Sequence, residues 1–406
     1  MTHIAVIGAG VTGVTTAYEL SRLGFEVTVF DRQRYAAMES SFANGAQLSA
    51  SNAETWTQWG TVLKGLKWML RRDAPLLVNP KPEWRKLKWM AAFLGQIPNY
   101  RANTIETVRL ALKAREALFE TAEREGIDFN LEKRGILHFY STEADFAHAK
   151  KVDLMLAEGG LERRQLAGHE LRQIEPALAG DFIGGFFTPS DSTGDVHDFT
   201  MGLARACEKA GVTFRFETTV TDARRDGGGL RFTTRTGEIH RFDGVVICAG
   251  VSSPEFAKSL GDEVNIYPVK GYSITIPLDD EQSRAAAPWV SLLDDRAKIV
   301  ASRLGEGRLR IAGTAEFNGY NRDIRADRIA PLTKWTEAYF PGVSTEHVKP
   351  WAGLRPMMPS MLPRVGAGKV KGVFFNTGHG HLGWTLSSAT ARIVAEAVAG
   401  AYPKTN

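Results

Sequence analysis

The chain has 406 residues, a length that favours two domains. Charged residues make up 24% of it and hydrophobic residues 43%, a globular composition that excludes a disordered chain. Fifty basic and 46 acidic side chains leave a net charge of +4, too small to predict a nucleic-acid-binding protein. Two cysteines, Cys207 and Cys248, exclude a disulfide framework and a cysteine-rich metal site.

Targeting signals are not found at the start of the chain. The first residues show no basic region, apolar core or small-residue cleavage site of a signal peptide. No apolar stretch of 18 or more uncharged residues predicts a transmembrane helix. We therefore expect a soluble protein of the cytoplasm.

The chain opens with a predicted βαβ unit. Residues 3–7 resemble a buried strand of a parallel sheet. Residues 14–23 have helical character that Gly24 ends, and a second strand, 26–30, follows.

Helical patterns then dominate up to residue 184, and short β patterns dominate from 264 to 320. The further elements predicted are helices at 105–124, 143–156 and 199–210, a buried strand at 243–250, and a strand, glycine turn and helix within 374–400. The predicted fold class is α/β. A discontinuous Rossmann-like domain would take residues 1–50, 185–262 and 350–406, and a second α+β domain residues 51–184 and 263–349.

A GxGxxG motif joins the first strand to the first helix. Gly8 allows the tight turn, Gly10 lets the backbone approach a pyrophosphate, and Gly13 lets the helix pack close to the sheet. Asp31, at the end of the next strand, would accept hydrogen bonds from ribose hydroxyls. This context predicts a dinucleotide site.

The helix start would contribute to the same site. The backbone N–H groups at Val11 and Thr12 face the phosphates. Arg32 raises the question of a 2′-phosphate, but the neighbouring Asp31 disfavours NADP. The motif does not separate FAD from NAD. The second strand–glycine element, ending at Ala249 and Gly250, and the glycine-rich C-terminal turn favour FAD.

Six segments in family order resemble the bacterial FAD-dependent D-amino acid dehydrogenases of small-subunit type, within the D-amino acid oxidase and glycine oxidase superfamily. They cover essentially the whole chain: 8–13, 41–49, 64–69, 267–273, 353–357 and 376–385. The resemblance implies an FAD-binding domain beside a substrate-binding domain.

The resemblance also implies which loops contact FAD. The 41–49 loop would run beside the isoalloxazine, Val220 near the adenine, and the 378–385 turn near the flavin ring, where its N–H groups would stabilise an anionic reduced flavin. The cofactor residues expected on this basis are Ser41, Asn44, Ala46, Gln47, Leu48, Val220, Gly353, Gly380, His381, Leu382, Gly383 and Thr385. Cys207 lies in a helical pattern and Cys248 in a buried strand, so we expect non-covalent FAD.

Arg355 is the principal catalytic-site candidate. The resemblance implies that it pairs with the substrate carboxylate, a task to which the planar guanidinium fork is suited. Tyr272 and Tyr320 would shape the pocket or bind the carboxylate, with simple packing as the alternative. His379 is a further candidate, but a structural role is the alternative for it and for His381, because an amine that binds neutral needs no side-chain base.

One segment departs from the family pattern. After the arginine the family usually continues Thr-Pro-Asp-Gly-x-Pro, whereas this chain has Met358-Pro359-Ser360-Met361-Leu362-Pro363 and then Arg364. If this loop borders the active site, the substrate range would differ.

Residues 56–97 are rich in tryptophan and basic residues. They are Trp56, Trp59, Trp68, Trp84 and Trp89, with Lys64, Lys67, Arg71, Arg72, Lys81, Arg85, Lys86 and Lys88 against only Asp73 and Glu83. Trp59, Val62, Leu63, Leu66 and Leu70 follow helical spacing. Packing against the protein's own core and peripheral contact with the inner face of an anionic membrane both remain open.

The function predicted is FAD-dependent oxidation of D-amino acids to 2-oxo acids and ammonia, by hydride transfer from Cα to flavin N5, with a quinone-type acceptor. Alternatives are a secondary amine or glycine as substrate (D-proline, D-hydroxyproline, sarcosine or glycine), a non-catalytic flavoprotein assembly factor, and an NAD-dependent dehydrogenase. The C-terminal glycine turn counts against the last of these.

Overall fold

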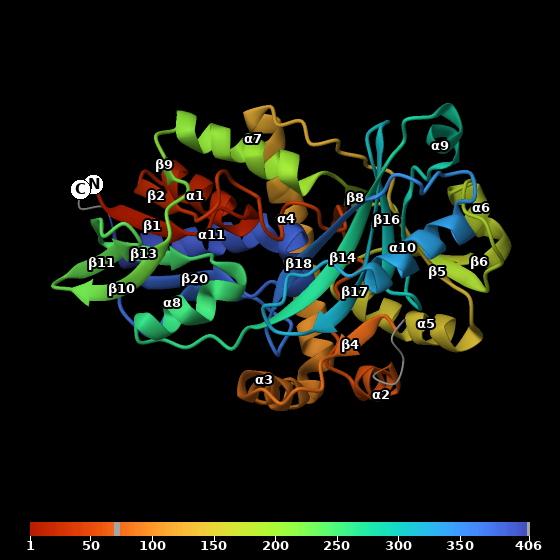
Figure 1. The fold of residues 1–406 in the computed structure, drawn as a ribbon, viewed down its shortest axis with the longest axis horizontal. Helices are drawn as coiled ribbons and strands as arrows, with labels where there is room; N and C mark the ends of the chain where they lie inside the picture. Colours follow the sequence, from red (N-terminus) through yellow and green to blue (C-terminus); the bar gives the residue numbers. More distant parts are fainter. Residues whose placement is uncertain (69–73, 404–406) are drawn as a thin grey trace.

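A computed structural model describes residues 1–68 and 74–403. Its elements form two connected parts that lie side by side in Figure 1. One part contains both described ends of the chain and a mostly parallel sheet, and the other contains a larger mixed sheet. None of the helices in the described ranges combines the length and apolar character needed to cross a bilayer.

The first part is built on a sheet of six strands in the order β19-β20-β13-β1-β2-β9. Their bounds are Arg364–Ala367, Val373–Thr377, Gly244–Ile247, His3–Ile7, Glu26–Phe30 and Thr213–Arg215. All neighbouring pairs are parallel except β19 and β20. The central strands are buried because both faces of the sheet are covered.

Helices cover one face and a small sheet covers the other. Helices α1 (Val11–Arg22), α7 (Val196–Lys209) and α11 (Gly383–Ala401) pack with Ile4, Val6 and Val29. On the other face, α8 (Ser253–Ser259) and the antiparallel strands β10, β11 and β12 pack against Ala5, Ile7 and Phe375; the strands span Val220–Asp226, Gly229–Thr234 and Ile239–Phe242. The carboxyl ends of β1 and β13 therefore open at one edge of a rigid layer.

The second part is a nine-stranded sheet in the order β18-β14-β17-β16-β15-β5-β7-β6, with β4 paired to β17. The bounds are Lys349–Met357, Tyr267–Pro277, Arg308–Phe317, Ile299–Leu304, Ser291–Asp294, Ile136–Tyr140, Gly184–Thr188, Arg164–Ala167 and Leu76–Val78. Helix α10 (Ala326–Tyr339) packs on it through Leu332 and Trp335. The long strands β14 and β18 reach towards the first part (Figure 1).

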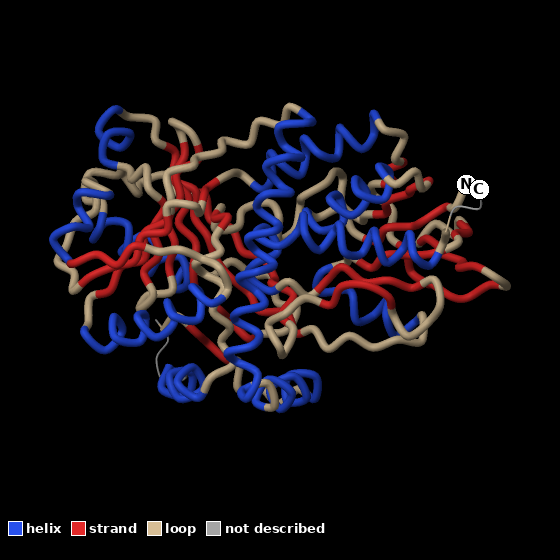
Figure 2. Tube along the Cα trace, turned by 180° about the vertical axis from the view of Figure 1, so that it is seen from behind, coloured by secondary structure: helices blue, strands red, loops and turns tan. Residues whose placement is uncertain are grey.

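The remaining helices lie around and between the two parts. They are α2 (Trp59–Trp68), α3 (Trp84–Leu94), α4 (Tyr100–Glu125), α5 (Glu143–Glu158), α6 (Leu171–Ile174) and α9 (Glu281–Ala286). The long helix α4 packs along α11, and α2 and α3 project together from one side of the molecule (Figures 1 and 2). A two-residue ribbon, β3 (Gln47–Leu48) with β8 (Ser192–Thr193), connects the parts.

The individual helices and strands expected from the sequence are present, but β5 and β6 also form within the stretch expected to be mainly helical. Three elements lie elsewhere than the expected domain boundaries imply. Strands β7 and β18, expected in the Rossmann-like domain, belong to the nine-stranded sheet. Helix α4, expected in the other domain, packs on α11. These placements depend on pairing partners distant in sequence, such as Val269 opposite Arg355.

Candidate active site

The glycine motif forms a turn that admits no side chain at two of its positions. Gly8 has φ +104°, and a Cβ there would lie 2.6 Å from the Cys248 carbonyl oxygen. A Cβ on Gly13 would lie 1.8 Å from the Gly8 carbonyl oxygen. At Gly10 the nearest atom to an added Cβ is Ser41 Oγ at 3.5 Å, an ordinary contact, and Gly10 lines the cavity described below. The turn therefore presents bare backbone at the start of α1.

Asp31 and Arg32 follow β2 at the same sheet edge. The Asp31 carboxylate accepts hydrogen bonds from the N–H groups of Ala9 (2.7 Å) and Gln33 (2.8 Å), while burial raises its pKa. Arg32 instead forms an ion pair with Glu39 at 2.8 Å. Its guanidinium is thus occupied by a carboxylate of the protein itself.

A cavity of about 750 Å³ runs from this turn to the nine-stranded sheet. It contains most of the residues that the sequence singled out. Those on its wall are Gly8, Gly10, Val11, Thr12, Asp31, Arg32, Ser41, Asn44, Ala46, Gln47, Val220, Ala249, Gly250, Tyr272, Gly353, Arg355, His379, Gly380, His381, Leu382, Gly383 and Thr385. Gly13, Leu48 and Tyr320 do not line it.

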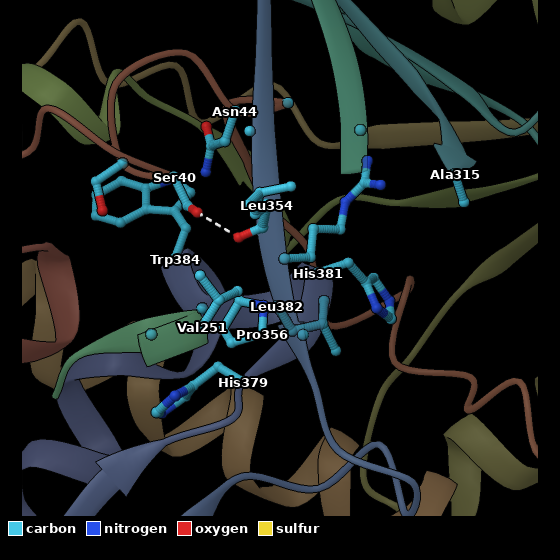
Figure 3. Close-up of a pocket in the computed structure, with 18 of the residues that line it drawn as sticks. Ser40, Asn44, Val251, Ala315, Leu354, Pro356, His379, His381, Leu382 and Trp384 are labelled. Atoms are coloured by element: carbon cyan, nitrogen blue, oxygen red, sulfur yellow. Dashed lines mark hydrogen bonds between the residues drawn. The ribbon is translucent and has the colours of Figure 1, made fainter. Parts of the chain in front are cut away.

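Hydrogen bonds fix the 40–49 segment along the cavity. Ser40 Oγ donates to the Leu354 carbonyl at 2.8 Å (Figure 3), and the Ser49 N–H donates to Thr385 Oγ1 at 3.2 Å. The Val11 N–H donates to Ser41 Oγ at 3.0 Å. This contact places Ser41 at the start of α1, whereas the resemblance implied the isoalloxazine side.

Arg355 lies on β18 inside the cavity. Its Nη1 donates to the Thr314 carbonyl at 2.8 Å, and its guanidinium occupies the space above Gly271, where an added Cβ would lie 2.3 Å from Cζ. Burial alone lowers the pKa of Arg355 to about 10, so within residues 1–68 and 74–403 no neighbouring carboxylate offsets the burial of this charge. The side chain stays protonated at neutral pH and can bind an anion in the cavity.

The two tyrosine candidates differ in position. The Tyr272 ring lines the cavity, and its hydroxyl donates to Glu316 Oε2 at 2.8 Å. Tyr320 is 38% exposed, and its hydroxyl donates to the Val251 carbonyl and accepts from Arg85. Tyr320 therefore does not reach the substrate region expected for it, because it sits in an exposed turn after β17.

The two histidines of the 378–385 turn point in opposite directions (Figure 3). His379 is 3% exposed, and its Nε2 lies 3.0 Å from Thr390 Oγ1. The His381 ring stacks on Trp56, with 5.0 Å between centroids, and its Nε2 donates to the Asn52 carbonyl at 3.3 Å. Burial lowers the pKa of His379 to about 3; burial, and then the Arg355 charge, lower that of His381 to about 4. Both rings are neutral near pH 7.

Sequence reasoning missed the far end of the cavity. Its wall there carries Glu54, Lys64, Asp145, His148, Asp295 and Lys298, contributed by a loop, two helices and the β15–β16 turn. Lys298 pairs with Asp295, and Lys64 lies 3.5 Å from Asp145. No local motif connects these positions; only Lys64 belonged to a segment that the sequence singled out.

The segment that departs from the family pattern lies outside the cavity wall. Met361 is buried in a cluster with Trp89 and Tyr267. The Ser360 carbonyl accepts a hydrogen bond from Asn103. The segment therefore does not border the cavity, which was the condition for it to alter the substrate range.

Three features of this cavity fit an oxidoreductase that binds a dinucleotide. They are a glycine turn without side chains at a helix start, a carboxylate after the next strand, and an arginine placed to bind an anion. The residues present suit FAD: Gly10 leaves space for a pyrophosphate, and η4 (Gly380–Leu382) and the start of α11 bring backbone N–H groups to the cavity. The family model for FAD dependent oxidoreductases, DAO, matches residues 3–397, so the chain belongs to this family.

Curated relatives span the whole chain. It is 60% identical over 405 residues to D-amino acid dehydrogenase 3 of Mesorhizobium japonicum, covering 99% of this chain and 98% of the relative. It is 41% identical to D-amino acid dehydrogenase of Paramagnetospirillum magneticum, covering 98% and 95%.

Solved structures share the fold. Glycine oxidase from Geobacillus kaustophilus superimposes with a TM-score of 0.75 at 22% identity, covering 98% of this chain and 95% of that one. L-proline dehydrogenase from P. horikoshii superimposes with a TM-score of 0.76 at 17% identity, covering 98% and 93%. The mixed architecture expected from the sequence is confirmed.

Proposed function

We propose that this FAD-dependent enzyme is a D-amino acid dehydrogenase that converts free D-amino acids to 2-oxo acids and ammonia. The observation that carries the proposal is the buried guanidinium of Arg355, whose charge no acidic group of the described part of the chain offsets, in the same cavity as the glycine turn. Its fork matches a carboxylate with two parallel hydrogen bonds. The D-amino acid dehydrogenase at 60% identity supports the same substrate class.

The glycine turn, Asp31 and the 40–49 and 378–385 segments would hold FAD, with Val220, Ala249 and Gly250 at the adenosine end. Cys207 does not line the cavity. Cys248 lines it beside Gly8, but its Sγ contacts Thr16 Oγ1 and burial raises the pKa of its thiol to about 12, so binding would be non-covalent. Bound FAD supplies the acceptor for the hydride that leaves the substrate Cα.

The chain's own residues would bind and orient the substrate. Arg355 holds the carboxylate, and its bond to the Thr314 carbonyl fixes the guanidinium. The neutral His379 and His381 add no positive charge that would repel an incoming ammonium group. Tyr272, tied to Glu316, contributes a rigid wall.

An anaerobic titration tests the proposal. The visible spectrum of the purified protein is recorded without added cofactor, and D- and L-amino acids, D-proline, sarcosine and glycine are then added one at a time. We expect a flavin spectrum that D-amino acids bleach and L-amino acids do not. Bleaching by secondary amines or glycine alone would replace the substrate class, and a yellow protein that none of them bleaches would overturn the proposal.

We also propose a quinone-type electron acceptor, reached through peripheral contact of α2 and α3 with a membrane. Large apolar side chains are exposed on these helices: Trp59 (62%), Leu63 (58%), Trp84 (77%) and Leu87 (50%). Both helices project from the same side of the molecule (Figures 1 and 2). Arg85 and Lys88 belong to α3, and Lys81 lies just before it in the chain. Aromatic and basic side chains together suit an anionic interface.

Part of the 56–97 segment serves other contacts. Trp56 stacks on His381, Trp89 is buried and donates to the Met357 carbonyl, and the buried Lys86 donates to two backbone carbonyls. Leu70, Arg71, Arg72 and Asp73, with the side chains of residues 66–68, lie outside the described residues.

Sedimentation with anionic liposomes tests the membrane contact. A variant with Trp59, Leu63, Trp84 and Leu87 changed to glutamine should lose most of its liposome binding and keep its flavin. The control changes two exposed apolar residues elsewhere, Leu154 (71%) and Ile239 (53%), to glutamine, and should still sediment. Undiminished sedimentation of the first variant would exclude this surface.

A further inference from the structure

Glu54 stands out among the charged residues at the far end of the cavity. Its Oε1 accepts three hydrogen bonds, from Gln58 Nε2 (2.7 Å), Tyr100 hydroxyl (2.6 Å) and His148 Nε2 (3.2 Å). None of the described residues donates to its Oε2. The carboxylate is thus fixed by one oxygen while the other remains open, on a side chain that is 21% exposed in the cavity wall.

The charges around Glu54 leave its own charge in excess. Lys298 pairs with Asp295, and Lys64 pairs with Asp145, so both lysines already have carboxylate partners. Glu54 contacts two neutral donors and His148, whose pKa it raises through their hydrogen bond. Whenever His148 is neutral, the described residues at this end of the cavity carry one net negative charge.

Glu54 also lies close to the part of the cavity where Arg355 would bind the substrate carboxylate. Asn52 and Trp56, two residues to either side, both contact His381, whose pKa the Arg355 charge helps to lower. Two residues of extended chain span at most about 7 Å, so the Glu54 backbone is near both contacts. Arg355 and Glu54 line the same cavity, so a long side chain on a substrate held by Arg355 would extend along it towards Glu54.

We propose that Glu54 is a specificity residue that binds the cationic end of a basic substrate side chain, so that D-arginine- or D-lysine-like amino acids are favoured. The proposal rests on the proposed function, because Arg355 must hold the substrate carboxylate. A guanidinium or ammonium group would donate to the open Oε2, and no hydrogen bond within the protein would need to break. An acidic side chain would meet the excess negative charge instead.

The test uses ligands that cannot be oxidised. 5-Guanidinopentanoate has the carboxylate and guanidinium of arginine but lacks the α-amino group, and pentanoate lacks both nitrogen groups. Their dissociation constants are measured on the flavin-containing protein at alkaline pH, from the change in the visible spectrum. The wild-type protein should bind the guanidino ligand more tightly, and Glu54→Gln should reduce this preference about tenfold while pentanoate binding stays within twofold.

A matched variant controls for the change in charge. Glu255, in α8, lines the same cavity as Gly250 and Val251, so Glu255→Gln makes the same substitution on another element of the wall. This variant should keep the preference. Glutamine at position 54 retains an oxygen that accepts from Gln58, Tyr100 and His148, so an intact flavin spectrum is expected.

Other outcomes would overturn the proposal. A wild-type protein that binds both ligands equally, or a preference that Glu54→Gln leaves unchanged, removes the role of Glu54. Weaker bleaching by D-alanine with an unchanged ligand preference would assign Glu54 to the α-amino group instead. Failure of every D-amino acid to bleach the flavin would overturn the proposed function separately, because the ligand preference is measured without turnover.

Discussion

The two ends of the cavity are lined by different chemical groups. At the dinucleotide end, the contact surface is backbone: Gly8 and Gly10 with the first N–H groups of α1, over a span of a few residues. At the other end it is made of charged side chains from a loop, helices and several strands, including Arg355 and Glu54. Binding at the dinucleotide end should therefore depend on the shape of the backbone, and binding at the other end on charge. Substitutions at the two ends should have different effects.

The largest effect is expected from adding a single carbon to the turn. Gly13→Ala would place Cβ 1.8 Å from the Gly8 carbonyl oxygen, and neither backbone segment can move without displacing α1 from the sheet. We expect loss of bound FAD and destabilisation of more than ~3 kcal/mol, measured by the flavin-to-protein ratio and by urea unfolding.

Gly10→Ala is the matched control for the turn. Its Cβ would make an ordinary contact with Ser41 Oγ at 3.5 Å, so the fold should persist even where FAD binding weakens. Equal destabilisation by Gly13→Ala and Gly10→Ala would contradict the conclusion that the close backbone contact at Gly13 is what excludes a side chain from the turn.

Arg355→Leu tests the end that depends on charge. Loss of the guanidinium should raise the apparent KM for D-amino acids on the order of 100-fold or more, because a charge-assisted pair disappears. The melting temperature should not fall, since the variant removes a buried charge that no carboxylate among the described residues offsets. Steady-state kinetics and thermal unfolding measure the two effects.

Arg355→Lys is the control that keeps the charge but loses the fork. It should recover part of the affinity. An unchanged KM in Arg355→Leu would remove the carboxylate role.

The same contrast explains what the sequence could predict. The turn from Gly8 to Gly13 and the carboxylate of Asp31 are encoded within one βαβ unit, so local spacing identifies them. Arg355 was identified through its family motif. Glu54 could not be found in this way, because its importance depends on Gln58, Tyr100 and His148 converging on one oxygen.

The buried His379 should make the stability of the protein depend on pH. His379 has a pKa lowered to about 3, so below the ordinary value of about 6.5 the unfolded chain binds a proton that the folded protein does not. Its contribution is complete above about pH 6.5 and declines as pH falls, by about 3 kcal/mol at pH 4.

His379→Gln should flatten this decline. The glutamine amide can still donate to Thr390 Oγ1, which itself donates to carbonyls of α11. Urea unfolding of the flavin-containing protein across this pH range measures the slope. The exposed His347→Gln is the control and should leave the slope as in wild type. An unaltered slope in His379→Gln would assign the acid sensitivity to other groups.

The smallest effect is expected at Tyr320. A variant there tests how far the charged end of the cavity extends. The Tyr320 hydroxyl binds the Val251 carbonyl and Arg85 outside the cavity, so Tyr320→Phe should cost about 1 kcal/mol of stability and leave kcat/KM within twofold. Tyr272→Phe is the informative partner, because it frees the buried Glu316 oxygen beside the cavity and should reduce kcat/KM further. If Tyr320→Phe instead raised KM as Arg355→Leu is expected to do, the substrate would have to reach beyond β17, and the side-chain end of the cavity would be larger than its walls define.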